Sequence, residues 1–364
     1  MARPVVRDDV ALMDGYHSPQ VDVAVRLNTN EAPEPPPSAF VDELRAAIGD
    51  VEWHRYPDRG AAALRTRIAE VEAPLVHAGI SAANVFAANG SNEVLQTLCL
   101  AYAGAGRSVL TFEPTYALHS HIAKVSGANV LDCPRREDFT LDVERAIEVV
   151  RDEAPIITFL CSPNNPTGRV ESEDAVVALL DAVESVDGLL VVDEAYGQFS
   201  PWSALSLVHD DRSVAVTRTY SKTWSAAALR LGYLVGPTWV VDELDKVVLP
   251  YHLDSMTQLA GLLALDHLDD MQRRVARLVE ERGRVAAALD ELEVDQWPSA
   301  ANFILFRPRH RSGDEVWSEL VERSVLVRNC SSWPGLDGCL RVTLGTPDED
   351  DVFLTALTEV LAAR

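Results

Sequence analysis

Residues 219–232, TYSKTWSAAALRLG, place Lys222 in a polar turn and bring Arg230 eight residues later. A lysine beside a second cation has a lowered pKa, and such a lysine is a nucleophile toward carbonyl groups. The planar fork of Arg230 suits a phosphate group, and the hydroxyls of Thr219 and Ser221 are neutral donors for the same anion. A reactive amine beside a phosphate cradle indicates pyridoxal 5'-phosphate held as a Schiff base. On this stretch alone, a surface lysine with Arg230 in an ordinary salt bridge remains an alternative.

Around this turn, from about residue 84 to residue 236, apolar strands alternate with helices. The runs 156–160 and 188–192 are continuously apolar, which is typical of strands that are covered on both faces. The alternation predicts an α/β fold with a mostly parallel central sheet and helices on both faces. Further strands are predicted at 85–88, 108–112 and 214–218, and helices at 94–100, 139–150 and 172–183.

Polar residues follow several of these strands, where open parallel sheets place the groups that bind ligands. Residues 89–93, NGSNE, lie between a strand and a helix, so free backbone N–H groups and the helix dipole predict an anion site there. Asp193 ends the apolar strand 188–192, and residues 163–168, PNNPTG, form a rigid turn after strand 156–160. Each motif alone is weak evidence for a ligand site, because most such turns only cap helices.

The segments on either side of this α/β region have a different sequence pattern. Residues 1–40 are predicted to be irregular apart from a strand-like piece at 21–27, because four prolines lie between residues 33 and 37. We predict a large domain at 50–255 and a smaller α+β domain that joins 1–49 to 256–364. The other predicted elements are helices at 41–48, 61–71, 257–268, 271–292 and 350–362, and strands at 302–306, 325–328 and 339–344.

Composition limits the classes of partner. The chain has 364 residues, 47% of them hydrophobic, and a net charge of −24, so it can bury a large core but repels nucleic acids and anionic membranes. Its five cysteines have no pairing or metal-binding pattern, which favours free thiols in a reducing cytoplasm. We find no signal peptide, no apolar run near the ~18 residues of a membrane helix, and no metal site.

Taken together, the motifs carry a family resemblance that covers nearly the whole chain. In their order and separation, NGSNE, PNNPTG, DEAY, TYSK and RLG resemble the class I and II aminotransferases of the aspartate aminotransferase fold, which use pyridoxal phosphate. The segments 27–31, 55–58, 193–196, 326–328 and 340–346 are similar to the histidinol-phosphate aminotransferases. That resemblance implies transfer of an amino group between L-histidinol phosphate and 2-oxoglutarate in L-histidine biosynthesis, by a homodimer with sites at its interface.

The resemblance also implies a role for each residue around the cofactor ring. Lys222 would form the Schiff base and then move the proton at the substrate α-carbon. Asp193 would pair with the pyridine nitrogen and keep it protonated. Tyr116 would stack on the ring, while Tyr196 and Asn165 would hydrogen-bond the ring oxygen.

Other residues would hold the anionic groups of cofactor and substrate. Tyr56 would reach the cofactor phosphate from the partner subunit. Arg341 and Arg328 would bind the phosphate of histidinol phosphate, and Arg341 would bind the carboxylate of glutamate or 2-oxoglutarate. Tyr16 and Asn30 are candidate contacts for the rest of the substrate. The phosphate ligands from the same subunit would be Ser91, Asn92, Thr219, Ser221 and Arg230.

Of three departures from the family pattern, the first two leave the donor open, and the third should be tolerated. Ala32 and Glu34 replace the usual residues near the expected substrate entrance, and residues 225–228 replace a run that contains glycine. The alternatives are a transaminase for an aromatic or other 2-amino acid, and decarboxylation of an amino-acid phosphate. A cofactor-binding regulator is a third alternative, but no basic helix-turn-helix segment precedes the domain.

Overall fold

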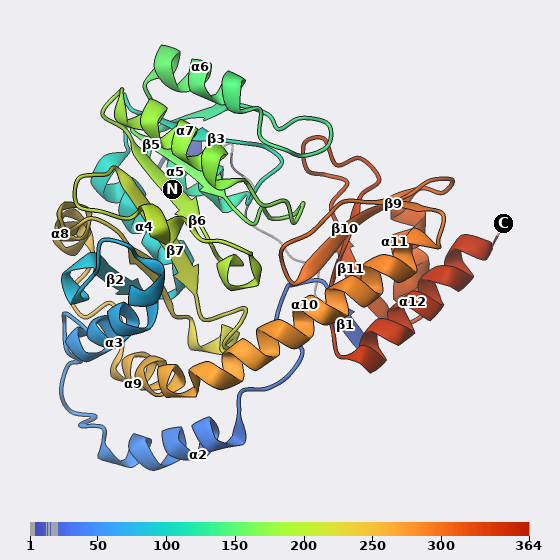
Figure 1. Cartoon of the computed structure of the whole chain (residues 1–364), viewed down its shortest axis with the longest axis horizontal. Helices are drawn as coiled ribbons and strands as arrows, with labels where there is room; N and C mark the ends of the chain where they lie inside the picture. The colour runs from blue at the N-terminus through green and yellow to red at the C-terminus, as the bar shows by residue number, and fades with distance from the viewer. Residues whose placement is uncertain (1–3, 12, 14, 16–20, 364) are drawn as a thin grey trace.

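The computed structural model describes residues 4–11, 13, 15 and 21–363, which form two sheets joined by a long helix (Figure 1). The seven-stranded sheet has the order β2-β8-β7-β6-β5-β3-β4, and the five-stranded sheet has the order β1-β11-β12-β10-β9. This arrangement agrees with the predicted α/β fold. The boundaries of two domains at 49/50 and 255/256 stay a prediction.

The seven-stranded sheet is parallel except for β8, which is antiparallel to both of its neighbours. Parallel strands need a long crossover, usually a helix, whereas the connection from β7 to β8 holds only a single 3-10 turn, Ala227–Leu229. The chain therefore turns back beside β7, and this connection carries Lys222. The strands are β2 Val85–Ala88, β3 Ser108–Thr111, β4 Asn129–Asp132, β5 Ile157–Cys161, β6 Leu189–Asp193, β7 Val214–Thr219 and β8 Gly232–Val235.

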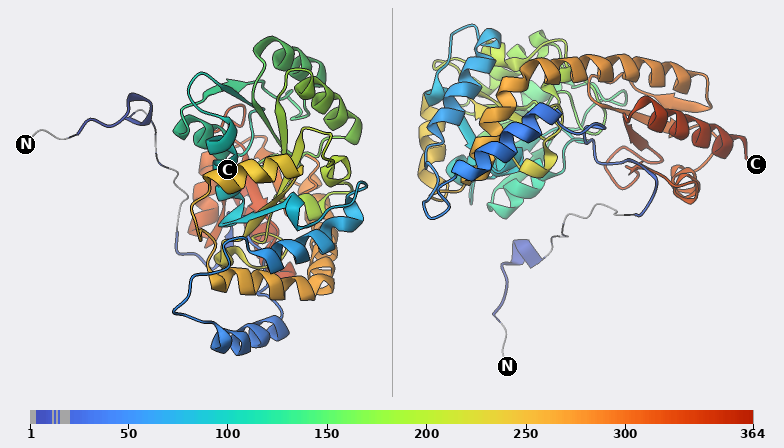
Figure 2. Two further views of the ribbon diagram at one scale, coloured as in Figure 1. Left: turned by 90° about the vertical axis from the view of Figure 1, so that its left-hand side faces the viewer. Right: turned by 90° about the horizontal axis from the view of Figure 1, so that it is seen from below.

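Helices cover both faces of this sheet, as the continuous apolar strands predict. Val191 packs on one side with α4, α5 and α8, while its neighbours Leu190 and Val192 pack on the other with α3, α6, α7 and α9. Figure 2 shows α2 on the outer side of α9. The helices are α1 Asp8–Ala11, α2 Ser38–Ala47, α3 Ala62–Glu72, α4 Gly90–Tyr102, α5 Leu118–Val125, α6 Val143–Glu153, α7 Glu173–Glu184, α8 Thr238–Val247 and α9 Ser255–Ala264.

The five-stranded sheet joins the start of the chain to its end. β1 pairs in parallel with β11, and the other pairs are antiparallel. A second apolar core lies between this sheet and α10, α11 and α12. α10 extends from beside α9 to the small sheet (Figure 1). The elements are β1 Val25–Leu27, α10 Leu268–Asp290, β9 Val294–Gln296, β10 Phe303–Pro308, α11 Gly313–Glu322, β11 Val325–Asn329, β12 Leu340–Thr343 and α12 Pro347–Ala362.

Most predicted elements are present, and the exceptions have local causes. The helix predicted at 139–150 begins only at Val143, because Phe139 has a left-handed backbone (φ 64°) and Asp142 caps the helix. The region predicted to be irregular contains α1 and the start of α2. β4, β8, β9, α5, α8 and α11 were not predicted. No helix in the described part of the chain is both long and apolar enough to cross a membrane.

Candidate active site

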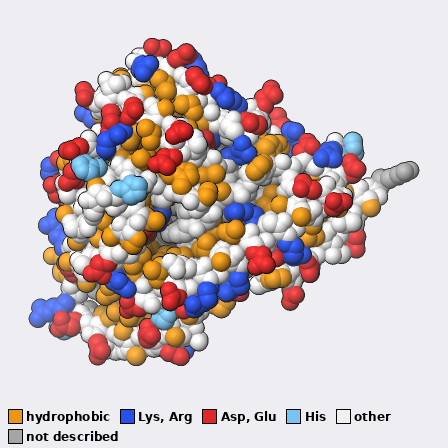
Figure 3. Space-filling model, in the orientation of Figure 1, with side chains coloured by type: hydrophobic (Ala, Val, Ile, Leu, Met, Phe, Trp, Pro, Cys, Tyr) orange, Lys and Arg blue, Asp and Glu red, His pale blue; other side chains and the backbone are white. Residues whose placement is uncertain are grey.

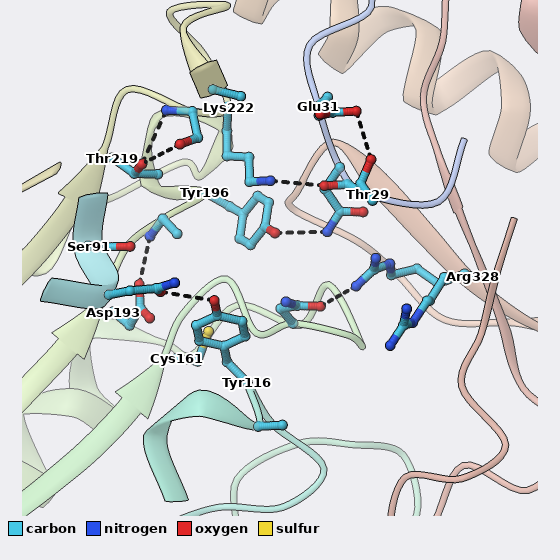
Figure 4. Close-up of a pocket in the computed structure, with 18 of the residues that line it drawn as sticks. Thr29, Glu31, Ser91, Tyr116, Cys161, Asp193, Tyr196, Thr219, Lys222 and Arg328 are labelled. Atoms are coloured by element: carbon cyan, nitrogen blue, oxygen red, sulfur yellow. Dashed lines mark hydrogen bonds between the residues drawn. The ribbon is translucent and has the colours of Figure 1, made fainter. Parts of the chain in front are cut away.

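A pocket of about 410 Å³ opens between the carboxyl ends of β5, β6 and β7 and the strands β11 and β12. It brings together thirteen of the fifteen predicted site residues. Figure 4 shows Ser91 and Thr219 on one side of the Lys222 amine and Arg328 on the other. The predicted residues that line the pocket are Asn30, Ser91, Asn92, Tyr116, Asn165, Asp193, Tyr196, Thr219, Ser221, Lys222, Arg230, Arg328 and Arg341.

Lys222 projects into the pocket from the β7–β8 connection, and its Nζ donates to the carbonyl oxygen of Thr29 at 3.0 Å. The pKa of the amine is lowered to about 8, first because burial removes water from the charged form and then because Arg341 lies nearby. Glu31 opposes this effect, and Arg230 adds a smaller depression. The predicted lowering of the Lys222 pKa is present, but desolvation and Arg341 cause more of it than Arg230, the cation on which the prediction was based.

Asp193 lies at the end of β6, buried, and its Oδ2 is 2.9 Å from Nε2 of His119. A carboxylate only accepts hydrogen bonds, so we assign the proton of this contact to Nε2. The His119 ring stacks on Phe159 at 4.9 Å and meets Tyr116 edge-on. Sequence reasoning missed His119; its only local signal is its position one helical turn after Tyr116.

Two tyrosines in the pocket are fixed by neighbouring amides. The Tyr116 hydroxyl donates to Asn92 Oδ1 at 3.0 Å. The Tyr196 hydroxyl accepts from Asn30 Nδ2 at 2.8 Å, and Thr343 donates to Asn30 Oδ1 at 3.0 Å. Asn30 therefore lines the pocket as predicted, but its side chain also positions Tyr196.

The start of α4 provides one anion site. The helix has no side-chain cap, so its first backbone N–H groups are open to a ligand. Gly90 has a left-handed backbone (φ +76°), and a Cβ there would lie 2.8 Å from Nη2 of Arg230. Ser221 Oγ accepts from Arg230 Nη1 at 3.4 Å and from Thr219 Oγ1 at 3.0 Å. Backbone donors, hydroxyls and a guanidinium thus converge in a cradle suited to phosphate.

Arg328 and Arg341 provide cationic groups on the other side of the pocket, where they lie directly opposite each other on β11 and β12. Arg341 is buried, donates to Asn165 Oδ1 and to Asn28 O, and lies over the Phe303 ring at 5.0 Å. Like charges directly opposite on neighbouring strands repel each other. A bound anion would relieve this repulsion, so the pair forms a second candidate anion site.

The remaining predicted residues lie elsewhere. Tyr56 does not line this pocket; it is 79% exposed and stacks on Tyr251 at 4.5 Å. Tyr16 is outside the described residues. Ala32 and Glu34 do not line the pocket either, and Glu34 is paired with Arg277 on α10. These two departures from the family pattern therefore lie away from the pocket wall.

The residues of the pocket fit pyridoxal phosphate. The uncapped start of α4 and Arg230 suit the phosphate of the cofactor. Lys222, an amine with a lowered pKa, suits its aldehyde. A protonated ring nitrogen needs a buried carboxylate, and Asp193 is buried. Among the described residues, His119 is the only one whose side chain hydrogen-bonds the Asp193 carboxylate. The two arginines of the far side are then left for the substrate.

Comparison with known proteins gives matches over nearly the whole chain. A family model described as aminotransferase class I and II matches residues 22–357. The histidinol-phosphate aminotransferase of Mycobacterium sp. (strain JLS) is 42% identical over 355 residues, which cover 96% of this chain and 92% of the relative. The protein of the same name from Corynebacterium diphtheriae is 40% identical over 359 residues, which cover 98% and 96%.

Solved structures match with similar coverage. Histidinol-phosphate aminotransferase from Sinorhizobium meliloti, in complex with pyridoxal 5'-phosphate, has a TM-score of 0.82 at 24% identity and covers 93% of this chain and 91% of that one. An aromatic aminotransferase from Pyrococcus horikoshii has a TM-score of 0.84 at 21% identity and covers 97% and 98%. At these identities the likeness establishes the fold alone.

We expect the cofactor-free protein to react with pyridoxal phosphate faster as the pH rises through about 8, the pKa of Lys222. Only the neutral amine attacks a carbonyl group, so the rate is low below this pKa and levels off above it. Stopped-flow absorbance between about pH 6 and about pH 10 measures the profile. Lys222→Ala should abolish the fast reaction, while Lys246→Ala, on the surface, should leave it unchanged. An inflection at the ordinary lysine pKa would contradict the assignment.

We expect Gly232→Ala to weaken cofactor binding about tenfold or more. The new Cβ would lie 2.2 Å from the backbone nitrogen of Ser91, so the start of α4 must move away from the phosphate cradle. Absorbance titration of the cofactor-free protein gives the dissociation constant. Gly283→Ala is the matched control, because nothing lies within 4 Å of its Cβ, and it should keep the wild-type affinity. Wild-type affinity in Gly232→Ala would refute the cradle.

Proposed function

The chain belongs to the aminotransferase class I and II family, and from this premise we propose that it transfers an amino group between L-histidinol phosphate and 2-oxoglutarate in L-histidine biosynthesis. The observation that carries the choice of substrate is the pair Arg328 and Arg341, opposite the phosphate cradle of α4. Two cations suit a dianionic phosphate, and relatives named histidinol-phosphate aminotransferase, 40–42% identical, support this choice.

When bound, pyridoxal phosphate supplies an aldehyde that condenses with amines and a ring that accepts electrons from the substrate α-carbon. The uncapped start of α4, Ser221 and Arg230 would hold its phosphate. Asp193, fixed by His119, would keep its ring nitrogen protonated. Tyr116 would cover the ring.

Lys222 carries the proton transfer in this proposal. With a pKa near 8, its amine exchanges a proton readily near neutral pH, which suits a general base that takes the proton from the α-carbon and returns it. Its hydrogen bond to Thr29 O holds the amine in the pocket, between the cradle that would hold the cofactor phosphate and the arginines that would orient the substrate.

The same arginines would serve both halves of the reaction. Arg328 and Arg341 would hold the phosphate of histidinol phosphate in one half and a carboxylate of glutamate or 2-oxoglutarate in the other. The buried position of Arg341, fixed by Asn165, favours one orientation of either anion. The same anion-binding end of the pocket would therefore bind one substrate in each half of the reaction.

We also propose a homodimer in the cytoplasm. Exposed aromatic and aliphatic side chains gather around Tyr56, including Trp53, Leu249 and Tyr251, as is typical of a surface that binds another subunit. A C2 interface would present Tyr56 of each subunit to the other subunit's pocket. Five free, buried cysteines support a reducing compartment.

Half-reactions of the cofactor-loaded protein test the substrate. Histidinol phosphate and glutamate should each convert the cofactor to its amine form efficiently. Phenylalanine should do so at least about tenfold less well, because it carries a single carboxylate, whereas histidinol phosphate carries a dianionic phosphate and glutamate carries two carboxylates. Absorbance of the cofactor gives the rate for each donor separately. Faster conversion by phenylalanine would instead identify a transaminase for aromatic amino acids.

Subunit mixing tests the dimer and the role of Tyr56. Lys222→Ala and Tyr56→Ala should each be nearly inactive, but a mixed dimer has one site with both native residues if Tyr56 acts across the interface. An equal mixture that exchanges subunits should therefore recover about a quarter of wild-type activity. A tag on one of the two variants allows mixed dimers to be isolated, which confirms that the subunits have exchanged. No recovery in the mixture would place Tyr56 outside the partner's site.

A further inference from the structure

A well-defined loop follows β11 and forms part of the pocket wall. Within residues 329–339, backbone N–H groups donate to carbonyl oxygens three residues earlier, from Trp333 to Cys330 at 2.9 Å and from Leu336 to Trp333 at 3.1 Å. Cys330 N also donates to Cys339 O at 3.0 Å, which closes the loop at its base. Cys330, Leu336 and Cys339 are the buried apolar residues of this loop. The loop therefore holds Trp333 in place at the pocket.

Trp333 contacts one of the two arginines that face the substrate. Its side chain lines the pocket, and the guanidinium carbon of Arg328 lies 5.8 Å from the centre of its ring. This distance is within the range of a cation–π interaction. Neither the sequence motifs nor the family resemblance had pointed to Trp333.

We propose that Trp333 is a specificity-determining residue, which holds Arg328 toward Arg341 and so gives the pocket its affinity for the phosphate end of the donor. This inference rests on the proposed function, because it concerns the same substrate. Trp333 acts through Arg328 and is a positioning residue; Arg328 and Arg341 are the groups that would touch the anion.

The chemistry of the contact explains why an aromatic ring serves this purpose. A carboxylate partner would occupy the N–H groups of Arg328 and cancel its charge. An aromatic face attracts the cation through its quadrupole but accepts none of the in-plane N–H donors. The contact with Trp333 itself therefore uses none of the donors that can bind two oxygens of one phosphate. Repulsion from Arg341, directly opposite, tends to separate the two guanidinium groups, and the contact with Trp333 opposes this separation.

The chain offers a matched control for this pair. Arg307 lies over the ring of Trp297 at 5.5 Å, a contact of the same kind that lines a different groove. Trp333→Leu and Trp297→Leu each remove one aromatic face and keep apolar bulk. Trp333→Phe keeps a smaller aromatic face over Arg328.

The test uses the cofactor-loaded protein and inorganic phosphate as a competitive inhibitor of the glutamate half-reaction. Because the cofactor phosphate already fills the α4 cradle, inorganic phosphate reports the Arg328 and Arg341 site. Trp333→Leu should raise the inhibition constant about fivefold, and Trp333→Phe should stay within about twofold of wild type. Trp297→Leu should match wild type. For histidinol phosphate, Trp333→Leu should raise KM about fivefold with little change in kcat.

The outcomes separate this inference from the proposed function. An unchanged inhibition constant in Trp333→Leu, an equal rise in Trp297→Leu, or no inhibition of the wild-type protein by phosphate would overturn the role of Trp333. Failure of the wild-type protein to prefer histidinol phosphate would overturn the proposed substrate alone, because the phosphate inhibition is measured against glutamate.

Discussion

The site depends on a buried ionic network that joins the ends of β6 and β7 to α3. Arg218, on β7, donates to Glu72 on α3 at 2.7 Å and to Glu194 at 2.8 Å, and Tyr233 on β8 donates to Glu72 as well. Removing these charges from water costs several kcal/mol per ion, so they are tolerated only where they meet with good geometry. Glu194 follows Asp193 and Arg218 precedes Thr219, and successive strand residues face opposite ways. The network on one face therefore fixes the residues of the pocket on the other.

Within this frame, the pocket concentrates positive charge in an acidic protein. The chain has a net charge of −24, and acidic side chains are spread over the face shown in Figure 3. In contrast, Lys222, Arg230, Arg328 and Arg341 all line one pocket. Burial is the main cause of the lowered pKa of Lys222, and the charges of Arg341 and Arg230 lower it further. The positive charges of the pocket also favour anionic ligands at both of its ends. The cationic side chains thus contribute both to the lowered pKa of the amine and to an environment suited to anions.

Some elements could be predicted because their environment leaves a local pattern. β5 and β6 are buried along their whole length, so their sequences are continuously apolar. β4 lies at the edge of the sheet with both ends exposed, and its sequence, NVLD, has no such pattern. α6 was placed too early because apolar Phe139 lies four residues before Val143, at helical spacing, although Phe139 belongs to the preceding turn. The edge position of β4 and the left-handed backbone at Phe139 explain these errors, because hydrophobic periodicity records neither of them.

The sequence by itself determined the α/β class, and it pointed to Lys222 as the candidate nucleophile, to a candidate phosphate cradle at the start of α4 and to the two arginines near the end of the chain. These features depend on neighbouring residue types or on family motifs, so the sequence alone reveals them. Only the tertiary structure decided that His119 supports Asp193, that Arg341 affects Lys222 more than Arg230 does, and that Trp333 lies over Arg328. Desolvation and the pairing of β11 with β12 arise from contacts between segments far apart in the chain, and no local pattern of residues encodes them.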